Sequence, residues 1–546
     1  MTVPAPSGEE RSWLPASMLL RNAIVLIAAA ALYLMSLFNG FAFDDSELVV
    51  NNTTVHGFSV ANIVSAFTGT SSSNEYLPLR DLAYMLDYQV WQLNPFGYHL
   101  SNLALYLCCC LALYLLLARL AGRWHSHGAE IAFIATLLFV FHPLHVEVVA
   151  GVAQRKDLLA CLFVIFAVAC HLRFLDHRRP GPYALALICT LLALFSKSSA
   201  VMVPLLLFAV ERMYPRDARP LSASLLAVVP HLLATVVVAG VQMKITAAAG
   251  YVGGDSAGAS LMVRLLNTPA VLWENVRLLL IPYPLSVTHI LLFSPSPWTV
   301  RILAGSLLAL GLAATFVLTL KRQKIVAFSI AWLLIALVPV SGIIPTGLPV
   351  AERYLFIPSV AVCLFLGYLA VVLDTSRGRR IGIALCLALI LSAYAAVALP
   401  RIRDWRDSVS LYAAEIRANP NQVRLYWIQG GNLFWSGRYA EAFRYLDEAR
   451  RRNPNYDIDY RVFSAFKAFQ DREYDRVLQT LDSIRFPGKN DIYEVNYLRG
   501  KALLALGDRE QARKQLTAAV SSRYFLRIIV RNEAALALQR LSGGAP

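Results

Sequence analysis

Long apolar runs separated by short polar loops fill residues 1–400 of the chain. Several approach the roughly 20 residues that a helix needs to cross the hydrocarbon core of a bilayer. They predict about eleven membrane-spanning helices and an all-α, polytopic membrane protein. The expected spans are 17–38, 98–120, 129–142, 152–173, 182–196, 199–211, 222–243, 299–320, 325–341, 353–373 and 381–399.

Two long interruptions, 39–97 and 244–298, mix polar and aromatic residues with apolar ones. In the first, 76–106 is dense in charged residues, Tyr and Trp, which is typical of helices at a membrane surface. In the second, the Gly/Ala/Ser-rich stretch 247–260 predicts a mobile loop, and 270–281 predicts an amphipathic interfacial helix.

From about Ser408 the pattern changes to helices with polar faces and a period of about 34 residues. Three repeats are visible, over 408–452, 455–487 and 490–523, with Gly437 and Gly507 at equivalent turns of the first and third. The spacing resembles tetratricopeptide repeats, whose helix pairs bury one another by stacking. We therefore expect a C-terminal α-solenoid domain over 401–546.

Composition supports the membrane assignment, because 57% of residues are hydrophobic and 16% are charged. The formal net charge of +15 comes from Lys and Arg scattered over short loops and the helical tail, which argues against a nucleic-acid partner. All eight cysteines lie in apolar stretches without metal-ligand or disulfide spacing, so we interpret them as small apolar packing residues.

The distribution of basic residues predicts the orientation of the chain. Alternate loops carry the excess of Lys and Arg that marks cytoplasmic loops. We expect a retained N-terminal anchor, a cytoplasmic N-terminus, an inner-membrane location and a periplasmic repeat domain. The basic loop residues are Arg123, Arg173, Arg178, Arg179, Arg212, Arg216, Arg219, Lys321, Arg322, Lys324, Arg377, Arg379 and Arg380.

Two groups of candidate site residues belong to the opposite set of loops. Asp44 and Asp45 follow the first span, where one carboxylate could serve as a general base or the pair could simply end a loop. The segment HPLHVEVVAGVAQRKD holds His142, His145 and Glu147, and continues to Arg155 and Lys156. The histidines and Glu147 could bind a metal, but Pro143 disturbs their alignment, so hydrogen bonding to a hydroxyl or phosphate is favoured.

Lys197 and Arg353 interrupt apolar runs on the same predicted face. Such charges are costly without a partner or a task, although each could also be a structural anchor. Together with Arg155 and Lys156 they predict an anion site.

Several motifs in this order resemble the transmembrane and tetratricopeptide-repeat O-mannosyltransferases, which belong to the GT-C superfamily. The motifs are FAFDD, YLPLRDLAY, LNPFGYHLSN, HPLHVEVVAGVAQRKDLLA, the Lys197 segment and AERYLFIPS, and the likeness spans nearly the whole chain. The chain departs from the family pattern at Leu77, where Arg is usual, and at Ser198, where Glu is usual.

The resemblance implies an enzyme that transfers mannose, or another hexose or pentose, from a polyprenyl-phosphate donor to a hydroxyl at the outer membrane boundary. We expect Asp45 or Asp44 to be the base. Neither a cofactor nor a metal is assigned, although a divalent cation could take part. The donor phosphate is expected to contact Arg353, Lys197, Arg155, Lys156 and Arg80. The sugar or the acceptor is expected to contact His142, His145, Glu147, Glu352 and Tyr354.

The acceptor and the class of function leave alternatives. The repeats favour an exported polypeptide with a Ser or Thr acceptor, but they could instead be a stacking cap or an oligomerisation module. The acceptor could also be a glycan or lipid hydroxyl. A transporter of lipid-linked glycans would place its charges near the bilayer midplane, and a membrane-anchored peptide-binding scaffold would need fewer spans.

Overall fold

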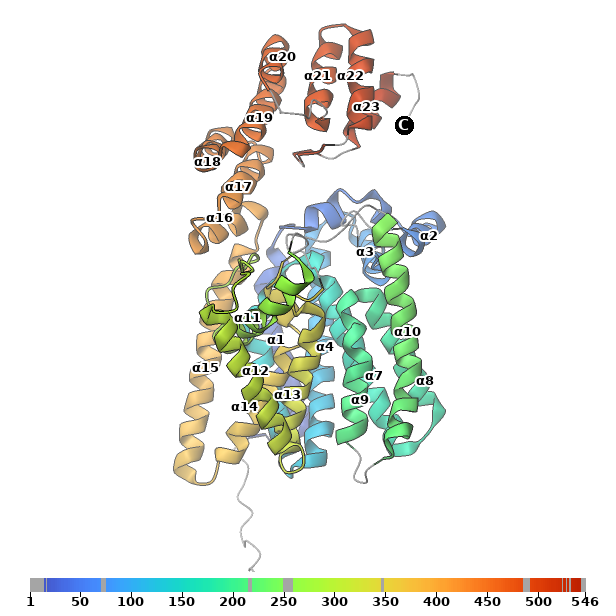
Figure 1. Cartoon of the computed structure of the whole chain (residues 1–546), viewed down its shortest axis with the longest axis vertical. Helices are drawn as coiled ribbons and strands as arrows, with labels where there is room; N and C mark the ends of the chain where they lie inside the picture. The colour runs from blue at the N-terminus through green and yellow to red at the C-terminus, as the bar shows by residue number, and fades with distance from the viewer. Residues whose placement is uncertain are drawn as a thin grey trace, which may run out of the picture. The chain divides into compact units, whose positions relative to one another are not determined.

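The structure is a computed structural model that divides the chain into two compact units, 1–407 and 408–546 (Figure 1). The division falls slightly after the expected boundary at 400, because the last helix of the first unit runs on to Asp404. Most of the loop expected over 247–260, and Arg216, lie outside the described residues. Those described are 14–15, 17–69, 75–214, 219–248, 259–344, 348–484, 492–522, 524–526, 528–529 and 532–541.

Unit 1 is a helical bundle, and each of the apolar runs predicted to span the membrane contains a helix. Among the described residues, six helices are long and apolar enough to cross a membrane, or up to seven with one bent pair. The number of spans stays a prediction. The helices of these runs are α1 (Met18–Tyr33), α4 (Pro95–Trp124), α5 (Gly128–Phe141), α7 (Arg155–His177), α8 (Pro180–Ser196), α9 (Val203–Met213), α10 (Leu221–Ala248), α12 (Val300–Thr319), α13 (Lys324–Leu337), α14 (Ser359–Leu373) and α15 (Arg377–Asp404).

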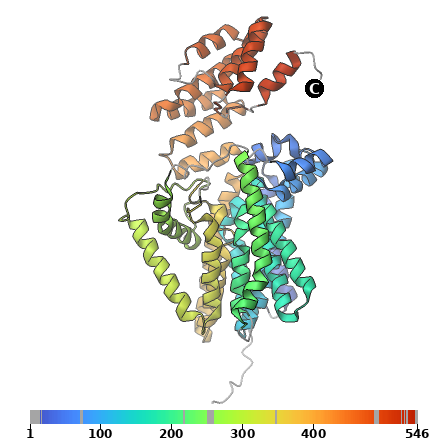
Figure 2. The ribbon, with the colours of Figure 1, turned by 45° about the vertical axis from the view of Figure 1, so that its right-hand side comes forward.

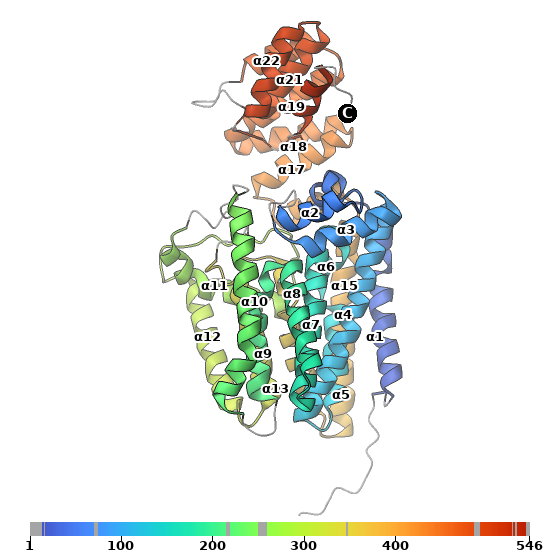
Figure 3. The same ribbon diagram turned by 90° about the vertical axis from the view of Figure 1, so that its right-hand side faces the viewer.

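Burial separates the centre of the bundle from its periphery. In the most apolar window of α7, 72% of residues are buried, compared with 17% in α12 and 6% in α15. Figure 3 shows α1 and α12 at opposite edges of unit 1, with α4 and α7 between them. Figure 2 shows α12, in yellow-green, splayed outward at one edge. We infer that α12 and α15 face lipid while α7 is enclosed by protein.

Three helices in the interruptions cover one end of the bundle. They are α2 (Val60–Thr68), α3 (Pro78–Trp91) and α11 (Leu261–Leu280). Pro78 begins α3, where a missing N–H costs nothing, and Asp81 lies in the first turn, where a negative charge is favourable. The buried face of α3 is polar, since it carries Arg80, Asp81 and Asp87.

The helix that begins with α5 breaks at Pro143. Proline lacks an N–H and disfavours the α conformation in the residue before it, and His142 accordingly has extended backbone angles. The chain turns by 56° into a short segment that ends at Ala150. Gly151 then passes the ring of Trp405 so closely that a Cβ would lie 2.8 Å from it. This tight break brings Glu147 and the start of α7 to the same end of the bundle.

Unit 2 consists of consecutive antiparallel helix pairs, the arrangement that tetratricopeptide repeats require. The repeat assignment itself stays a prediction. Gly437 and Gly507 have φ of +80° and +91° at the equivalent turns, and Arg472 takes this conformation in the middle pair. The helices are α16 (Ser408–Ala418), α17 (Val423–Trp435), α18 (Tyr439–Arg452), α19 (Asp457–Gln470), α20 (Tyr474–Asp482), α21 (Tyr493–Ala505), α22 (Arg509–Ser521) and α23 (Glu533–Leu541).

The first helix pair depends on close contact at Gly430. A Cβ at this position would lie 2.6 Å from Cγ of Leu446, whereas a Cβ at Gly431 would meet Phe463 at an ordinary 3.4 Å. We predict that Gly430→Ala destabilises unit 2 by about 1–3 kcal/mol through overpacking. Gly431→Ala is the matched control, because alanine favours the helix without a clash. The test is thermal unfolding of the full chain, monitored by tryptophan fluorescence. Equal melting temperatures for the two variants would contradict the prediction.

Candidate functional site

A group of ionisable side chains meets at the end of unit 1 where α7 begins and α8 finishes. We call this group the charged cluster and this end the site end. Its members come from loops and helix ends that are far apart in sequence. They are Asp44, Glu75, Arg80, Glu147, Lys156, Asp157, Lys197 and Arg353.

The Arg353–Glu147 pair joins two distant segments. One guanidinium nitrogen lies 2.6 Å from Glu147 Oε1, and the Arg353 backbone N–H donates to Oε2 at 3.0 Å. Glu147 is fully buried. Although burial opposes the charge of Arg353, the Glu147 carboxylate holds the pKa of Arg353 above its usual value. Removing either partner would leave the other buried and unpaired.

Lys197 lies beside this pair, at the end of α8. It is ion-paired with Asp157, and its Nζ lies 5.6 Å from the ring centroid of Tyr354. The Arg353 guanidinium lies 5.2 Å from the same ring. Burial lowers the pKa of Lys197, and the charges of Lys156 and Arg353 act in the same direction. The pocket between these side chains has room for about one water, ≈ 10 Å³, so a sugar would need it to open.

Glu75 connects Lys156 and Arg80, and sequence reasoning missed it. Its Oε2 lies 2.8 Å from Lys156 Nζ and 3.0 Å from Arg80 Nη1. Arg80 also pairs with Asp81 at 2.9 Å. Burial alone would raise the pKa of Glu75, but the charges of Lys156 and Arg80 outweigh this effect and lower the pKa to about 2. Its position just ahead of the YLPLR motif was the available signal.

Asp44 and Asp45 have different surroundings. Asp45 is fully buried, and its two carboxylate oxygens accept hydrogen bonds from the backbone N–H groups of Ala153 at 2.6 Å and Ala42 at 3.0 Å. Burial raises the pKa of Asp45 to about 7 against those hydrogen bonds. Asp44 keeps part of its surface exposed. The burial of the rest raises the pKa of Asp44, although the charges of Arg353, Lys156 and Arg80 act to lower it. Among the described residues no hydrogen bond or ion pair engages the Asp44 carboxylate.

Arg155 points into a separate buried network. It is ion-paired with Asp87, donates to Asn102 Oδ1 at 2.9 Å and to the Tyr98 carbonyl at 2.9 Å, and lies 5.1 Å from the ring of Tyr84. This network fastens the start of α7 to α3 and α4. The structure therefore does not bring Arg155 into the charged cluster. Gln154, another residue that sequence reasoning missed, is buried beside it with both amide atoms unpartnered among the described residues.

The two histidines and Glu352 hold the backbone around the cluster. His142 Nε2 lies 3.0 Å from the Leu279 carbonyl, and His145 Nε2 lies 2.9 Å from Ser359 Oγ. Glu352 accepts from the Ser286 N–H and lies 3.3 Å from His289. Within the described ranges, no three His, Cys, Asp or Glu residues are grouped so that they could hold a metal ion.

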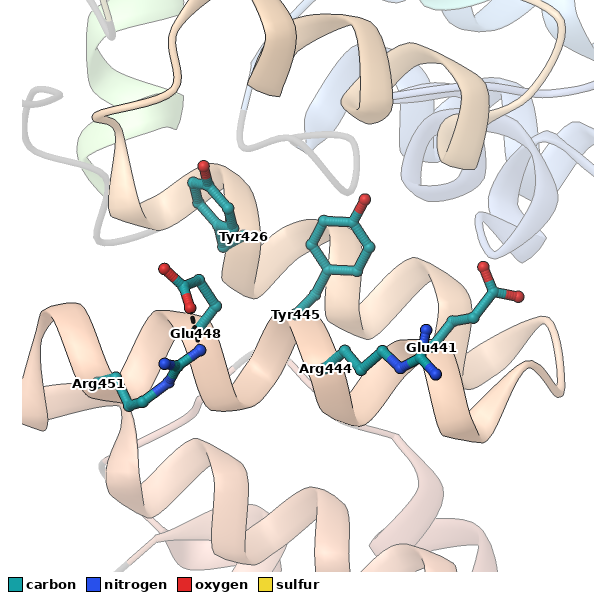
Figure 4. A pocket seen from close by; sticks show the side chains of 6 residues that line it. All are labelled: Tyr426, Glu441, Arg444, Tyr445, Glu448 and Arg451. Carbon is teal, nitrogen blue, oxygen red and sulfur yellow. Dashed lines mark hydrogen bonds and ion pairs between the residues drawn. The ribbon is translucent and has the colours of Figure 1, made fainter.

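Unit 2 has a pocket of its own on α17 and α18, with a volume of ≈ 440 Å³, within the range of ligand sites (Figure 4). Two tyrosine rings lie side by side in it, with centroids 6.2 Å apart. Carboxylates and guanidinium groups surround them. The lining residues are Tyr426, Glu441, Arg444, Tyr445, Glu448 and Arg451.

Two solved structures align weakly with this chain, and both are of the Archaeoglobus fulgidus oligosaccharyltransferase. The apo form matches with a TM-score of 0.40 and 13% identity, over 78% of this chain and 59% of that one. The form tethered to an acceptor peptide matches with a TM-score of 0.39 and 12% identity, over 79% and 58%.

Curated relatives match most of the chain at low identity, while no protein-family model matches it. Protein O-mannosyl-transferase TMTC3 of Mus musculus is 25% identical over 79% of this chain and 51% of its own length. Protein O-mannosyl-transferase F38B6.6 of Caenorhabditis elegans is 25% identical over 80% and 64%. The chain thus spans about half to two thirds of the length of these relatives. The resemblance that the sequence motifs predicted is confirmed: this chain is similar to the TMTC protein O-mannosyl-transferases.

Proposed function

We propose that the chain is a membrane glycosyltransferase that moves a monosaccharide from a polyprenyl-phosphate donor to a hydroxyl, with Ser or Thr of an exported protein as the acceptor. The observation that carries the proposal is the charged cluster, where cations lie around the partly exposed carboxylate of Asp44 at the end of an apolar helical bundle. The names of the relatives support the same reaction class. A lipid-bound phosphate and a water-borne hydroxyl can meet at such a boundary.

Asp44 is the better candidate for the general base. Both oxygens of Asp45 are engaged by backbone N–H groups, so its role is to fix the loop that carries Asp44. Asp44 takes the proton from the acceptor hydroxyl while that oxygen bonds to the anomeric carbon. The bond from this carbon to the donor phosphate breaks, and the phosphate leaves as an anion. Because it leaves as a stable anion, no second acid is needed.

Cations of the cluster stabilise the departing phosphate. Arg353 and Lys197 both lie near the ring of Tyr354, and Lys156 and Arg80 both pair with Glu75. Fixed cations at the point where charge develops lower the barrier without reorganising during the reaction. Arg155, His142 and His145 support the backbone of the site, Glu147 and Glu352 hold the Arg353 segment, and Tyr354 offers a ring to the sugar.

The membrane orientation and the acceptor complete the proposal. The loops rich in Lys and Arg lie at the bundle end opposite the site end. By the positive-inside rule, this supports an extracytoplasmic location for the site. A periplasmic unit 2 would then hold the acceptor polypeptide. Its pocket around Tyr426 and Tyr445 suits an aromatic or charged side chain of an extended peptide.

Removing the proposed base tests the reaction. Asp44→Asn keeps the shape of the side chain but cannot accept the proton, so transfer should fall by about 10²–10⁴-fold. The assay follows transfer from polyprenyl-phosphate mannose to Ser/Thr peptides by purified full-length protein. Asp374→Asn, which alters an ion pair at the opposite end, is the control. Undiminished transfer by Asp44→Asn would exclude Asp44 as the base.

The pH profile provides a second test of the base. Because the pKa of Asp44 is raised, its basic form is lost on acidification at a pH above the ordinary Asp value of about 4. We predict that kcat/KM is constant at high pH and falls as the pH is lowered through this raised pKa. A profile that stays flat down to about pH 4 would contradict the assignment.

Arg353 can be tested separately from the stability that it confers. Arg353→Ala should lower the transfer rate on the order of 100-fold and also lower the melting temperature, because Glu147 is left buried and unpaired. Adding Glu147→Gln removes that unpaired charge. The double variant should therefore recover melting temperature without recovering rate. If the rate returned together with stability, Arg353 would be a structural residue.

A further inference from the structure

The cations of the charged cluster are already neutralised, although a donor phosphate needs them. Arg353 is paired with Glu147, Lys197 with Asp157, and Lys156 with Glu75. An incoming phosphate therefore cannot bind an uncompensated charge. One of the carboxylates has to leave, or the phosphate has to share its partner.

The carboxylates differ in how easily they could leave. The side chains of Glu147 and Asp157 are 0% and 4% exposed, and Asp81 beside Arg80 is 7% exposed. Moving any of them would require a buried charge to lose its partner, which is strongly unfavourable. Glu75 is 41% exposed and precedes α3 in non-helical chain, so its carboxylate can turn into water. Its partners Lys156 and Arg80 are 11% and 0% exposed, so the arriving phosphate has to replace the negative charge as Glu75 leaves.

The location of Glu75 is that of an anion held by two cations. Its Oε2 is within 3.0 Å of both Lys156 Nζ and Arg80 Nη1. Asp81 stays with Arg80 if Glu75 leaves, whereas Glu75 is the partner that the described structure gives Lys156. Departure of Glu75 would therefore free chiefly the Lys156 ammonium. This ammonium is close to Asp44, because the charges of both Lys156 and Glu75 affect the pKa of Asp44.

We propose that Glu75 is a displaceable counter-ion that occupies a phosphate subsite formed by Lys156 and Arg80, and that the phosphate monoester of the donor replaces it. This inference rests on the proposed function, because it identifies where the donor phosphate lies. Glu75 then sets the affinity for the donor, since each binding event must first expel its carboxylate. It also keeps Lys156 neutralised while the site is empty.

Binding of farnesyl phosphate to the purified full-length protein, measured by calorimetry in detergent, tests the proposal. Glu75→Gln keeps the size of the side chain but removes the competing charge, so the dissociation constant should fall about two- to fivefold. The melting temperature of the ligand-free variant should fall, because the largely buried Lys156 loses its partner. Glu130→Gln, which loses a comparable ion pair to Arg21, is the matched control and should not change binding. An unchanged or raised dissociation constant for Glu75→Gln would overturn the inference.

Further arms separate the phosphate from the lipid tail and from folding. Inorganic phosphate should show the same ratio between wild type and Glu75→Gln, and a gain shared by farnesol would contradict the inference. Lys156→Met should weaken farnesyl phosphate binding about tenfold, and it provides a test even if Glu75→Gln fails to fold. If the wild type binds no farnesyl phosphate, the proposed function fails. If it binds while these variants behave as wild type, only the inference fails.

Discussion

Lysine and arginine side chains in an apolar bundle need carboxylates against them, because an unpaired charge removed from water is costly. Unit 1 meets this requirement with ion pairs between distant segments. Glu147 follows the break after α5 and holds Arg353, which precedes α14. Asp157 in the first turn of α7 holds Lys197 at the end of α8. The pairs that neutralise the cations therefore also fasten these helix ends around Asp44.

Breaks in regular helix make this arrangement possible. Pro143 ends one helix, and Gly151 lets the chain pass close to Trp405. Just before α7, the Ala153 N–H donates a hydrogen bond to the Asp45 carboxylate. Each break turns side chains toward the site end instead of along a continuous helix face. The interaction of Asp45 with two backbone N–H groups supports the loop in which its neighbour Asp44 stays available. Catalysis and structural support can thus be divided between two adjacent carboxylates.

The apolar runs were sufficient to predict the helices of unit 1, because membrane-length hydrophobic segments have few alternatives to helix. They could not give the number of spans, since several helices, such as α8, α13 and α14, are too short to decide by length. The sequence grouped Lys197 and Arg353 with Glu147 by topology and motif. It could not separate Asp44 from Asp45, whose difference depends on distant N–H donors, nor exclude Arg155 from the cluster. Glu75 was missed because it stands just outside the YLPLR motif and its partner Lys156 lies 81 residues away.

The account depends on a donor phosphate binding among Arg353, Lys197, Lys156 and Arg80, with the anomeric carbon facing Asp44. The most direct measurement is a cryo-electron-microscopy structure of the full chain with a non-transferable polyprenyl-phosphonate sugar. The account predicts phosphonate density within hydrogen-bonding distance of at least two of these cations, and the sugar beside the Asp44 carboxylate. Density for the phosphonate at the opposite end of the bundle, or in a place that leaves all four cations without contact, would contradict it.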